Sequence, residues 1–394
     1  MSGVAGVEIK AAIKKAATWG TPVAAGLHDG ILILPTSVKK SAGNDVDDSL
    51  GTFIPVDGNP GEIKVEGDIP MYLRYDGLDL LLALFLGTAG DPAQQGGTTA
   101  YAYLYKWLMS VDGLFVTYVK NMKNYIEENA SAKVVGLTIK GETGKALQLI
   151  VKTICQNKVF DSVINTTSTF NNVTIFESAN RVRFSEGVFR MNDKDGAALS
   201  DADKIYPSSF ELSAQRKMRG VYGQYKTAAP NVQDLIDEPT NDGTPTVTLK
   251  LTFPRHSNTT YLSVLGSDTR KKMDITFTGR LIAAPYYRTF KIQMPHLQMT
   301  GDDPADAMGI ITEPLDFNVL GTLSAPAGMA ALTDPFWISG VNRLATNPLT
   351  GSQPAMASPS ASPSQSVSAS PSVSVSSSPS SSPSASASSS PSAS

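Results

Sequence analysis

Two short segments of the chain resemble loops that bind phosphate or calcium. Gly141-Glu142-Thr143-Gly144-Lys145-Ala146 resembles a phosphate loop, but its glycines lie too close together and Ala146 has no hydroxyl to ligate magnesium. Asn192-Asp193-Lys194-Asp195-Gly196 resembles half of a calcium loop, yet Met191 and Ala202 stand where that loop requires carboxylates. We therefore interpret the first segment as a hairpin turn and the second as a turn.

The three histidines and the single cysteine do not suggest a metal site. His28, His256 and His296 lack a zinc-like spacing, and no other His or Cys stands near any of them in the sequence. Cys155 falls on the apolar face of an alternating segment, so we expect a buried, inert thiol. One cysteine forms no intramolecular disulfide, and folding in a reducing cytoplasm is the simplest interpretation.

No pattern in the sequence marks an enzyme. A Gly-x-Ser-x-Gly elbow is absent, and a catalytic function has to be argued from a site. We therefore predict no catalytic activity, no cofactor and no metal. An enzyme with a site hidden in irregular loops is kept as an alternative.

The charge and hydrophobicity of the chain argue against several classes of function. The formal net charge is -3, so no strong positive field exists to hold nucleic-acid phosphates or an anionic membrane. The longest apolar run, Leu80 to Leu86, is far short of the roughly 20 residues that a membrane helix requires. The first 25 residues contain no apolar core of a secretory signal. We expect neither membrane insertion nor secretion by the usual signal.

Residues 344–394 are expected to form a disordered Ser/Pro-rich tail. From Ser358 to Ser394 only Ser, Pro, Ala, Val and Gln occur, without a charge or an aromatic ring. Such a segment buries too little apolar surface to offset the entropy cost of ordering. A soluble spacer is the simpler interpretation, and a modified or surface-binding decoration is the alternative.

Alternation of polar and apolar residues predicts strands with one wet face. In residues 62–69, apolar residues such as Ile63 and Val65 alternate with charged ones. Segments 246–253, 272–278 and 289–294 repeat this pattern, which is typical of antiparallel sheets. Further strands are predicted at 101–109, 114–119, 134–140, 147–155, 182–191 and 210–215. The candidates for a polar sheet face are Glu62, Lys64, Glu66, Asp68, Thr248, Lys250, Asp274 and Thr276. The alternative for each of them is a position in bulk solvent on an ordinary sheet.

Only two short helices are predicted. Asp76 is expected to cap a helix over residues 78–86, which ends at Gly87. A second helix is expected over residues 261–265, before Gly266.

The order of the predicted elements repeats once along the chain. Each predicted helix follows an alternating segment and precedes further strands. We therefore interpret the chain as two tandem β halves, residues 1–170 and 171–343, each with a short packed helix. The expected fold class is mainly β, followed by the tail.

A charged segment lies between two of the predicted strands. Residues 41–48 are rich in turn formers and acidic side chains and follow two lysines, so a loop is predicted there. A solvated loop and an arm that docks on the next copy through Lys-to-Asp pairing are equal alternatives. The residues of this arm are Lys39, Lys40, Asp45, Asp47 and Asp48.

In combination, several short motifs resemble a known family. They are Lys15-Ala16-Ala17-Thr18-Trp19-Gly20-Thr21-Pro22, Ile33-Leu34-Pro35-Thr36-Ser37, Gly67-Asp68-Ile69-Pro70, Leu73-Arg74-Tyr75-Asp76-Gly77-Leu78, Thr252-Phe253, Phe290-Lys291-Ile292-Gln293-Met294-Pro295 and Leu315-Asp316-Phe317. Over about residues 10–322 their order resembles the major tail tube proteins of long, flexible-tailed bacteriophages of the siphovirus type. The resemblance is to the form with two tube domains in one chain.

The resemblance implies a fold and an assembly. It implies β-sandwich or barrel-like halves whose strands join across subunits into an inner barrel, with a helix packed outside. Rings, expected as trimers that imitate six-fold symmetry, would stack into the tail tube of the virion, through which genomic DNA passes. The implied partners are further copies of the chain and other tail proteins, and folding is expected in the host cytoplasm before assembly. The candidate polar face would then line the lumen, and the candidate arm would contact the next ring.

The Ser/Pro tail departs from the tube domain of that family. A cell-surface β-sandwich protein with a mucin-like Ser/Pro stalk is therefore the alternative function, although it requires export. Surface display predicts glycosylated protein outside cells.

Overall fold

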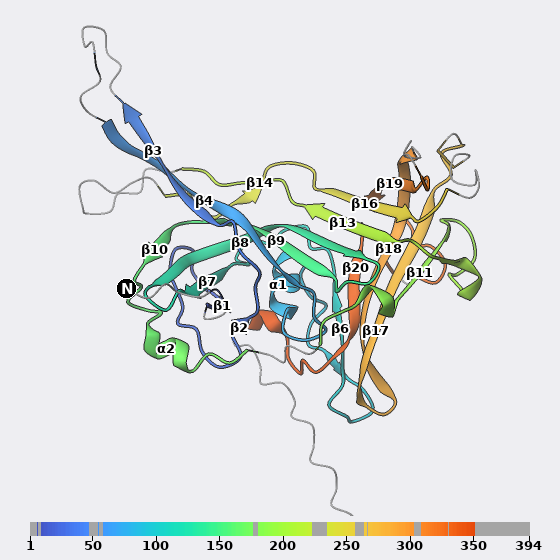
Figure 1. The fold of residues 1–394 in the computed structure, drawn as a ribbon, viewed down its shortest axis with the longest axis horizontal. Coiled ribbons are helices and arrows are strands. Elements are labelled where there is room, and N and C mark those ends of the chain that lie inside the picture. The colour runs from blue at the N-terminus through green and yellow to red at the C-terminus, as the bar shows by residue number, and fades with distance from the viewer. Residues whose placement is uncertain are drawn as a thin grey trace, which may run out of the picture. The chain divides into compact units, whose positions relative to one another are not determined.

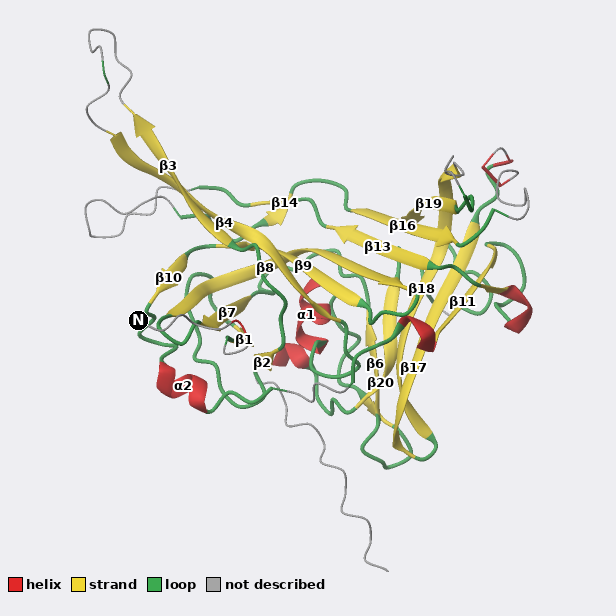
Figure 2. Ribbon diagram, in the orientation of Figure 1, coloured by secondary structure: helices red, strands yellow, loops and turns green. Residues whose placement is uncertain are grey.

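A computed structural model of the chain describes residues 6, 9–46, 54, 58–175, 180–222, 235–256, 264–265, 267–302, 309–329 and 331–350. They all belong to one unit, Met1–Ser358, and the second unit, Pro359–Ser394, lies outside the described residues. Strands make up most of the regular structure (Figure 2). The expected mainly β fold class is therefore confirmed.

The elements follow one another along the chain as a series of strands with a few short helices. They are β1 (Lys10–Lys15), β2 (Gly30–Ile31), β3 (Lys39–Val46), β4 (Gly58–Tyr72), α1 (Asp79–Phe85), β5 (Ala93–Gln94), β6 (Tyr101–Tyr105), β7 (Val116–Asn121), β8 (Ile126–Glu142), β9 (Gln148–Cys155), β10 (Lys158–Phe160), α2 (Thr167–Asn171), η2 (Phe184–Glu186), β11 (Gly187–Asp193), η3 (Asp201–Asp203), β12 (Lys204–Ile205), β13 (Ser209–Gln215), β14 (Met218–Arg219), β15 (Thr240–Asn241), β16 (Thr246–Phe253), β17 (Lys271–Ala283), β18 (Tyr286–Asp302), β19 (Glu313–Leu320), β20 (Trp337–Asn342) and η4 (Pro348–Thr350), where η marks a 3-10 helix.

Strand formation follows from the alternation in the sequence. In β16, Val247, Leu249 and Leu251 are buried, while Thr246 and Lys250 on the other face are exposed. The same period of two recurs in β9 and β13. Because one face of each strand is apolar, the strands bury that face in a shared core. The register of the strand pairing is then fixed, because a shift by one residue would turn the apolar side chains to the solvent.

The strands pair in the same order twice. In the first half of the chain, β1 pairs with β7, β7 with β8, β8 with β9, β9 with β4, and β4 with β3. In the second, β11 pairs with β17, β17 with β18, β18 with β19, β19 with β16, and β16 with β13. All of these pairings are antiparallel. The division into two tube-like domains near residue 170 stays a prediction.

One pairing joins the two sets of strands into a continuous sheet. β8 pairs with β13 over seven residues, from Gly136 opposite Gln215 to Glu142 opposite Ser209. β20 makes a second connection, because it pairs with β18 and with β6. The described chain stays packed after β20, since Leu344 is buried and η4 contacts α1. Residues 344–350 therefore belong to the described fold, residues 351–394 lie outside the described part, and the start of the Ser/Pro tail stays a prediction.

Helix α1 differs from the prediction at its start. Gly87 follows the helix with φ +107° and donates its N–H to the Ala83 carbonyl at 2.8 Å, so the predicted stop is confirmed. Leu78 occupies the N-cap position without a side-chain hydrogen bond. The prediction that Asp76 caps the helix is wrong, because its carboxylate accepts a hydrogen bond from the buried Arg288.

The loop predicted after Lys40 is in part a strand. Residues up to Val46 belong to β3, which pairs with residues 58–66 of β4. Both strands extend as a two-stranded ribbon past the neighbouring strands (Figure 1). The backbone pairing overrides the turn-forming residue types of this segment.

The second predicted helix, over residues 261–265, falls mostly outside the described residues. Residues 264, 265 and 267 are described, and they are helical.

Candidate functional site

An extensive polar surface lies on one face of six neighbouring strands. β4, β9, β8, β13, β16 and β19 follow one another through continuous pairing. On the opposite face these strands bury apolar side chains, among them Ile69, Val151, Leu137, Leu212, Leu249 and Phe317. Since side chains alternate along a strand, the polar residues of all six strands share the other face. We call this surface the polar sheet face.

A row of alternating charges crosses four strands of the polar sheet face. Lys140 on β8 lies opposite Glu211 on β13, and Glu211 lies opposite Lys250 on β16. Lys250 lies opposite Asp316 on β19, and its Nζ is 3.6 Å from an oxygen of that carboxylate. Directly opposed side chains in a sheet are close enough to interact. Each lysine of the row therefore has a carboxylate as its immediate neighbour.

The remaining lysines of this face also lie beside carboxylates. Lys152 on β9 lies opposite Asp68 on β4. Lys64 lies between Glu62 and Glu66 on the same side of β4, two residues from each. The lysines of the face are Lys64, Lys140, Lys152 and Lys250. Its carboxylates are those of Glu62, Glu66, Asp68, Glu142, Glu211 and Asp316, so the carboxylates outnumber the lysines.

Six of the eight predicted polar-face residues lie on this surface. Glu62, Lys64, Glu66, Asp68 and Lys250 are exposed, and Thr248 is half-buried. They come from β4 and β16, which are separated in the sheet by β9, β8 and β13.

The other two predicted residues lie on β17, outside the six strands. Asp274 is buried, with only 5% of its surface exposed. Its carboxylate lies 3.7 Å from the Arg190 guanidinium and 3.3 Å from Lys291 Nζ. Thr276 is half-buried opposite Val188. Asp274 therefore balances two cations beneath the surface and does not face open solvent.

The predicted arm residues fall at the ribbon of β3 and β4. Lys39 and Lys40 are exposed on β3, and Lys40 Nζ donates to Asn157 Oδ1 at 3.0 Å. Asp45 belongs to β3, and the structure describes its backbone but not its side chain. Asp47 and Asp48 lie outside the described residues.

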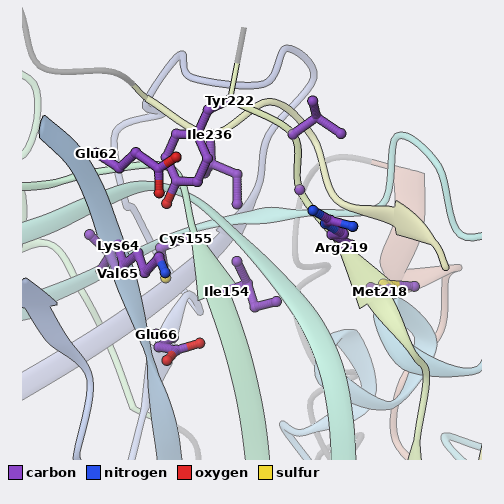
Figure 3. Close-up of a pocket in the computed structure, with 12 residues that line it drawn as sticks. Glu62, Lys64, Val65, Glu66, Ile154, Cys155, Met218, Arg219, Tyr222 and Ile236 are labelled. Atoms are coloured by element: carbon purple, nitrogen blue, oxygen red, sulfur yellow. The ribbon is translucent and has the colours of Figure 1, made fainter. Parts of the chain in front are cut away.

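A cavity of about 520 Å³ opens beside β4 at one end of the polar sheet face (Figure 3). Glu62, Lys64 and Glu66 line it from β4, Tyr222 lies beside Glu62, and Arg219 lies across the cavity from them. The Tyr222 hydroxyl donates to the Ile63 carbonyl at 3.0 Å. Burial, and then the two glutamates, raise the pKa of Tyr222. The cavity is thus walled by charges of both signs and a neutral phenol.

The described residues do not assemble a reactive centre around this cavity. Cys155 also lines it, but burial raises the pKa of its thiol to about 12, so the nucleophilic thiolate is not formed at neutral pH. No group of three or more His, Cys, Asp or Glu side chains suited to a metal ion occurs in the described part of the chain. Within the same part, no helix has the length and apolar character of a membrane span.

The two loop-like motifs of the sequence have simple structural roles. Residues 142–147 turn the chain from β8 into β9, with Lys145 N–H donating to the Glu142 carbonyl at 3.1 Å. Gly144 adopts φ +83° there, which only glycine does without strain. The interpretation of this segment as a hairpin turn is confirmed. Asn192 and Asp193 end β11, and Gly196 N–H closes a turn onto the Asp193 carbonyl at 3.0 Å.

Five charged residues of the polar sheet face were not identified from the sequence. They are Lys140, Glu142, Lys152, Glu211 and Asp316. Period-two alternation in predicted strands 134–140, 147–155 and 210–215 was the available signal for Lys140, Lys152 and Glu211. It could not assign them to one common face, because that depends on which strands are neighbours.

Comparison with known proteins gives the family. A family model described as phage tail tube protein matches residues 6–319. No curated protein matches the chain. The matched region contains five strands of the polar sheet face completely and β19 up to Val319. The chain therefore belongs to the phage tail tube protein family, whose members are structural proteins of the virion tail that assemble with copies of themselves and with other tail proteins.

Proposed function

We propose that this chain forms stacked rings that enclose a hollow tail tube, and that the polar sheet face lines the lumen through which genomic DNA passes. One observation carries this proposal: six strands from both halves of the chain present a continuous polar face on which the four lysines lie beside carboxylates. Charged and hydroxyl side chains make much of this face wettable, with Ile150 and Ile154 of β9 lying among them. It also offers no cluster of free cations.

The charge arrangement suits transit of DNA better than binding of DNA. A protein that neutralises phosphates with free Lys or Arg side chains gains affinity through counterion release. Here Lys140, Lys152 and Lys250 face Glu211, Asp68 and Asp316 across neighbouring strands. Of the eight polar-face residues predicted from the sequence, six are proposed to line the lumen: Glu62, Lys64, Glu66, Asp68, Thr248 and Lys250. Asp274 and Thr276 do not fit this role, because their strand lies outside the face.

The proposed ring contains three chains and imitates six-fold symmetry. Two sets of strands with the same pairing order support two tube-like domains in each chain, near residues 1–170 and 171–343. Three such chains would contribute six similar domains. This is the two-domain form expected of a siphovirus-type tail tube.

Stacking of the rings is proposed to use the ribbon of β3 and β4. Lys39 and Lys40 are exposed on β3, and the acidic residues Asp45, Asp47 and Asp48 follow them in the sequence. Opposite charges in one arm allow pairing with the adjacent ring. Folding in the host cytoplasm before assembly fits the single, buried thiol of Cys155.

Negative-stain electron microscopy of the purified full-length chain tests the proposed function. We expect hollow tubes or stacked rings with a pore of about the width of duplex DNA. Tubes without a pore would contradict the lumen. Uniform monomers under all assembly conditions would contradict the ring proposal itself.

A further inference from the structure

Three arginines gather just beyond the end of β4, next to the polar sheet face. Arg74 lies opposite Arg181 in an antiparallel bridge, and Arg183 follows two residues later in the same extended segment. Leu73 and Val182, which stand between them in the sequence, are buried. Because side chains alternate along an extended chain, all three arginines lie on the side of the polar residues of β4. We call them the arginine cluster.

The arginine cluster holds positive charges close together at the surface. Arg181 and Arg183 are exposed, and the Arg181 guanidinium lies 5.1 Å from the centre of the Tyr72 ring. Burial, and then repulsion from Arg181, lower the pKa of Arg74. In the part of the chain that the structure describes, no carboxylate forms an ion pair with Arg181 or Arg183. The cluster is therefore suited to an anionic partner, in contrast to the lysines of the polar sheet face.

An acidic segment stands at the other end of β4. Residues 44–57 contain four aspartates and no basic residue. They lead from the end of β3 to the start of β4, at the tip of the ribbon that extends past the neighbouring strands (Figure 1). We call residues 44–57 the acidic tip. Its aspartates are Asp45, Asp47, Asp48 and Asp57.

The acidic tip is too far from the arginine cluster of its own chain to bind it. β4 has 15 residues, so its two ends are about 45–50 Å apart at the rise of a strand. Only residues 47–57 join β3 to β4. A segment of this length that leaves and returns at the same end of the ribbon extends over about 20 Å at most. The two charged features therefore need a second copy of the chain in order to meet.

We propose that the arginine cluster of one chain binds the acidic tip of a chain in the adjacent ring. The inference rests on the proposed tube and names the surface that receives the ribbon. Each chain carries one cluster and one tip, at opposite ends of the same strand. Head-to-tail stacking brings the two together at every boundary between rings, and a contact between unlike surfaces repeats along a tube without closing. Guanidinium and carboxylate groups also form paired, charge-assisted hydrogen bonds.

The second half of the chain already contains a contact of this kind. β14 and β15 lie between β13 and β16, which hold the places of β3 and β4 in the repeated pairing order. Glu238, just before β15, forms an ion pair with the buried Lys133 of β8 and accepts a hydrogen bond from the Gly113 N–H at 2.8 Å. A carboxylate of this connecting segment thus fastens it to a cation of the other half.

Charge exchange between the two surfaces tests the inference in the full-length protein. Arg181→Glu with Arg183→Glu is expected to reduce the mass of sedimented tubes by about ten-fold or more, because carboxylates then face the aspartates of the tip. Asp45→Lys with Asp47→Lys and Asp48→Lys is expected to have the same effect. All five substitutions together are expected to restore the tubes.

A matched control changes two exposed cations outside the cluster. Arg280→Glu with Lys217→Glu alters the net charge as much as the change in the cluster does. This variant is expected to assemble as the parent protein does.

A second measurement avoids charge reversal. Arg183→Lys keeps the positive charge and supplies an amine, which a carbodiimide joins to a neighbouring carboxylate as an amide. Tubes grown from a mixture of unlabelled and isotope-labelled chains should give peptides of mixed label that link position 183 to the acidic tip, as detected by mass spectrometry. Arg280→Lys supplies an amine at another exposed position and should give no such peptide.

The outcomes separate this inference from the proposed function. Normal tubes from Arg181→Glu with Arg183→Glu overturn the inference and leave the tube intact, and a loss of affinity for duplex DNA in these tubes would identify phosphates as the occupant. Tubes of Arg183→Lys without mixed-label links also overturn it, and this result decides if a reversal variant does not fold. Absence of rings and tubes from the parent protein overturns the inference together with the proposed function.

Discussion

Arg288 Nε donates a hydrogen bond to Asp76 Oδ2 at 2.7 Å, and the two side chains are almost completely buried. Asp76 stands just before α1, whereas Arg288 belongs to β18, so the pair joins distant parts of the chain. Asn180 Nδ2 donates to the same Asp76 oxygen at 3.2 Å. The pair therefore belongs to a buried polar network that connects the helix to the second set of strands.

Removal of the arginine should destabilise the fold strongly. We expect Arg288→Met to lower the free energy of unfolding by about 3–5 kcal/mol, because it leaves the Asp76 carboxylate buried without its cation. Arg280→Met changes an exposed arginine of the same hairpin and should shift stability by less than about 0.5 kcal/mol. Urea unfolding of both variants, followed by circular dichroism, measures the difference. Equal midpoints would contradict the importance of the ion pair.

Asp79 should make stability depend on pH. Burial, reinforced by repulsion from Asp76, raises its pKa from 3.8 to about 6, even though Tyr105 and Asn342 donate hydrogen bonds to it. The folded state therefore holds the proton more tightly than the unfolded state. The stabilising contribution is complete below about pH 4 and is lost as the pH rises to about 6, a change of roughly 3 kcal/mol.

The variant Asp79→Asn isolates this contribution. Its stability relative to the parent protein should increase between pH 4 and pH 6 and stay constant above pH 7. Urea midpoints of both proteins across this range provide the measurement. A difference that does not vary with pH would show that Asp79 titrates normally.

Arg216 should hold α1 against the junction of β8 and β13. Its Nε donates to the Phe85 carbonyl and its Nη2 to the Leu108 carbonyl, each at 2.9 Å, and its guanidinium lies 4.3 Å from the Trp107 ring centre. Burial lowers its pKa to about 10, so it remains charged at pH 7. We expect Arg216→Leu to cost about 2–4 kcal/mol, because two carbonyls lose their donor and a cation–π contact is lost.

Exposed Lys217 is the matched control for Arg216. Lys217→Ala removes a neighbouring cation and should change the denaturation midpoint little. Thermal unfolding by calorimetry distinguishes the two variants. A similar loss from both would show that net charge, and not the contacts of Arg216, is responsible.

Reversal of one charge in the polar sheet face should create affinity for DNA. Glu211→Lys leaves Lys140 and Lys250 without the carboxylate between them and places three cations on adjacent strands. Fluorescence anisotropy with duplex DNA should detect binding that weakens steeply as salt increases. Asp195→Lys makes the same charge change at an exposed turn and should bind much less. Equal binding by both variants would contradict the role assigned to the row of charges.

Deletion of the residues after Pro354 should leave assembly intact. The described fold ends at Thr350 in η4, whose contact with α1 the truncation preserves. Electron microscopy should show tubes of unchanged diameter from the shortened chain. Failure of the shortened chain to assemble would show that the Ser/Pro tail takes part in tube formation.

Local pattern was sufficient to predict half of the strands of the described chain. The alternating residues 246–253 form β16, and the predicted strand 147–155 contains β9. These strands were predictable because the side chains on the buried side of a strand recur at every second residue. The stop at Gly87 was predictable for a similar reason, since a positive φ favours glycine at that position. The role of Asp76 was not predictable, because its partner Arg288 is more than two hundred residues away.

The sequence by itself determined that this is a mainly β chain with polar strand faces, and its motifs pointed to the tail tube family. Only the tertiary structure decided that β8 and β13 are neighbours, which places Lys140, Glu211, Lys250 and Asp316 in one row, and that Asp274 lies under the surface between two cations. The physical reason is that alternation fixes which side of a strand is wet, whereas the identity of its neighbours depends on backbone pairing between residues far apart in the chain.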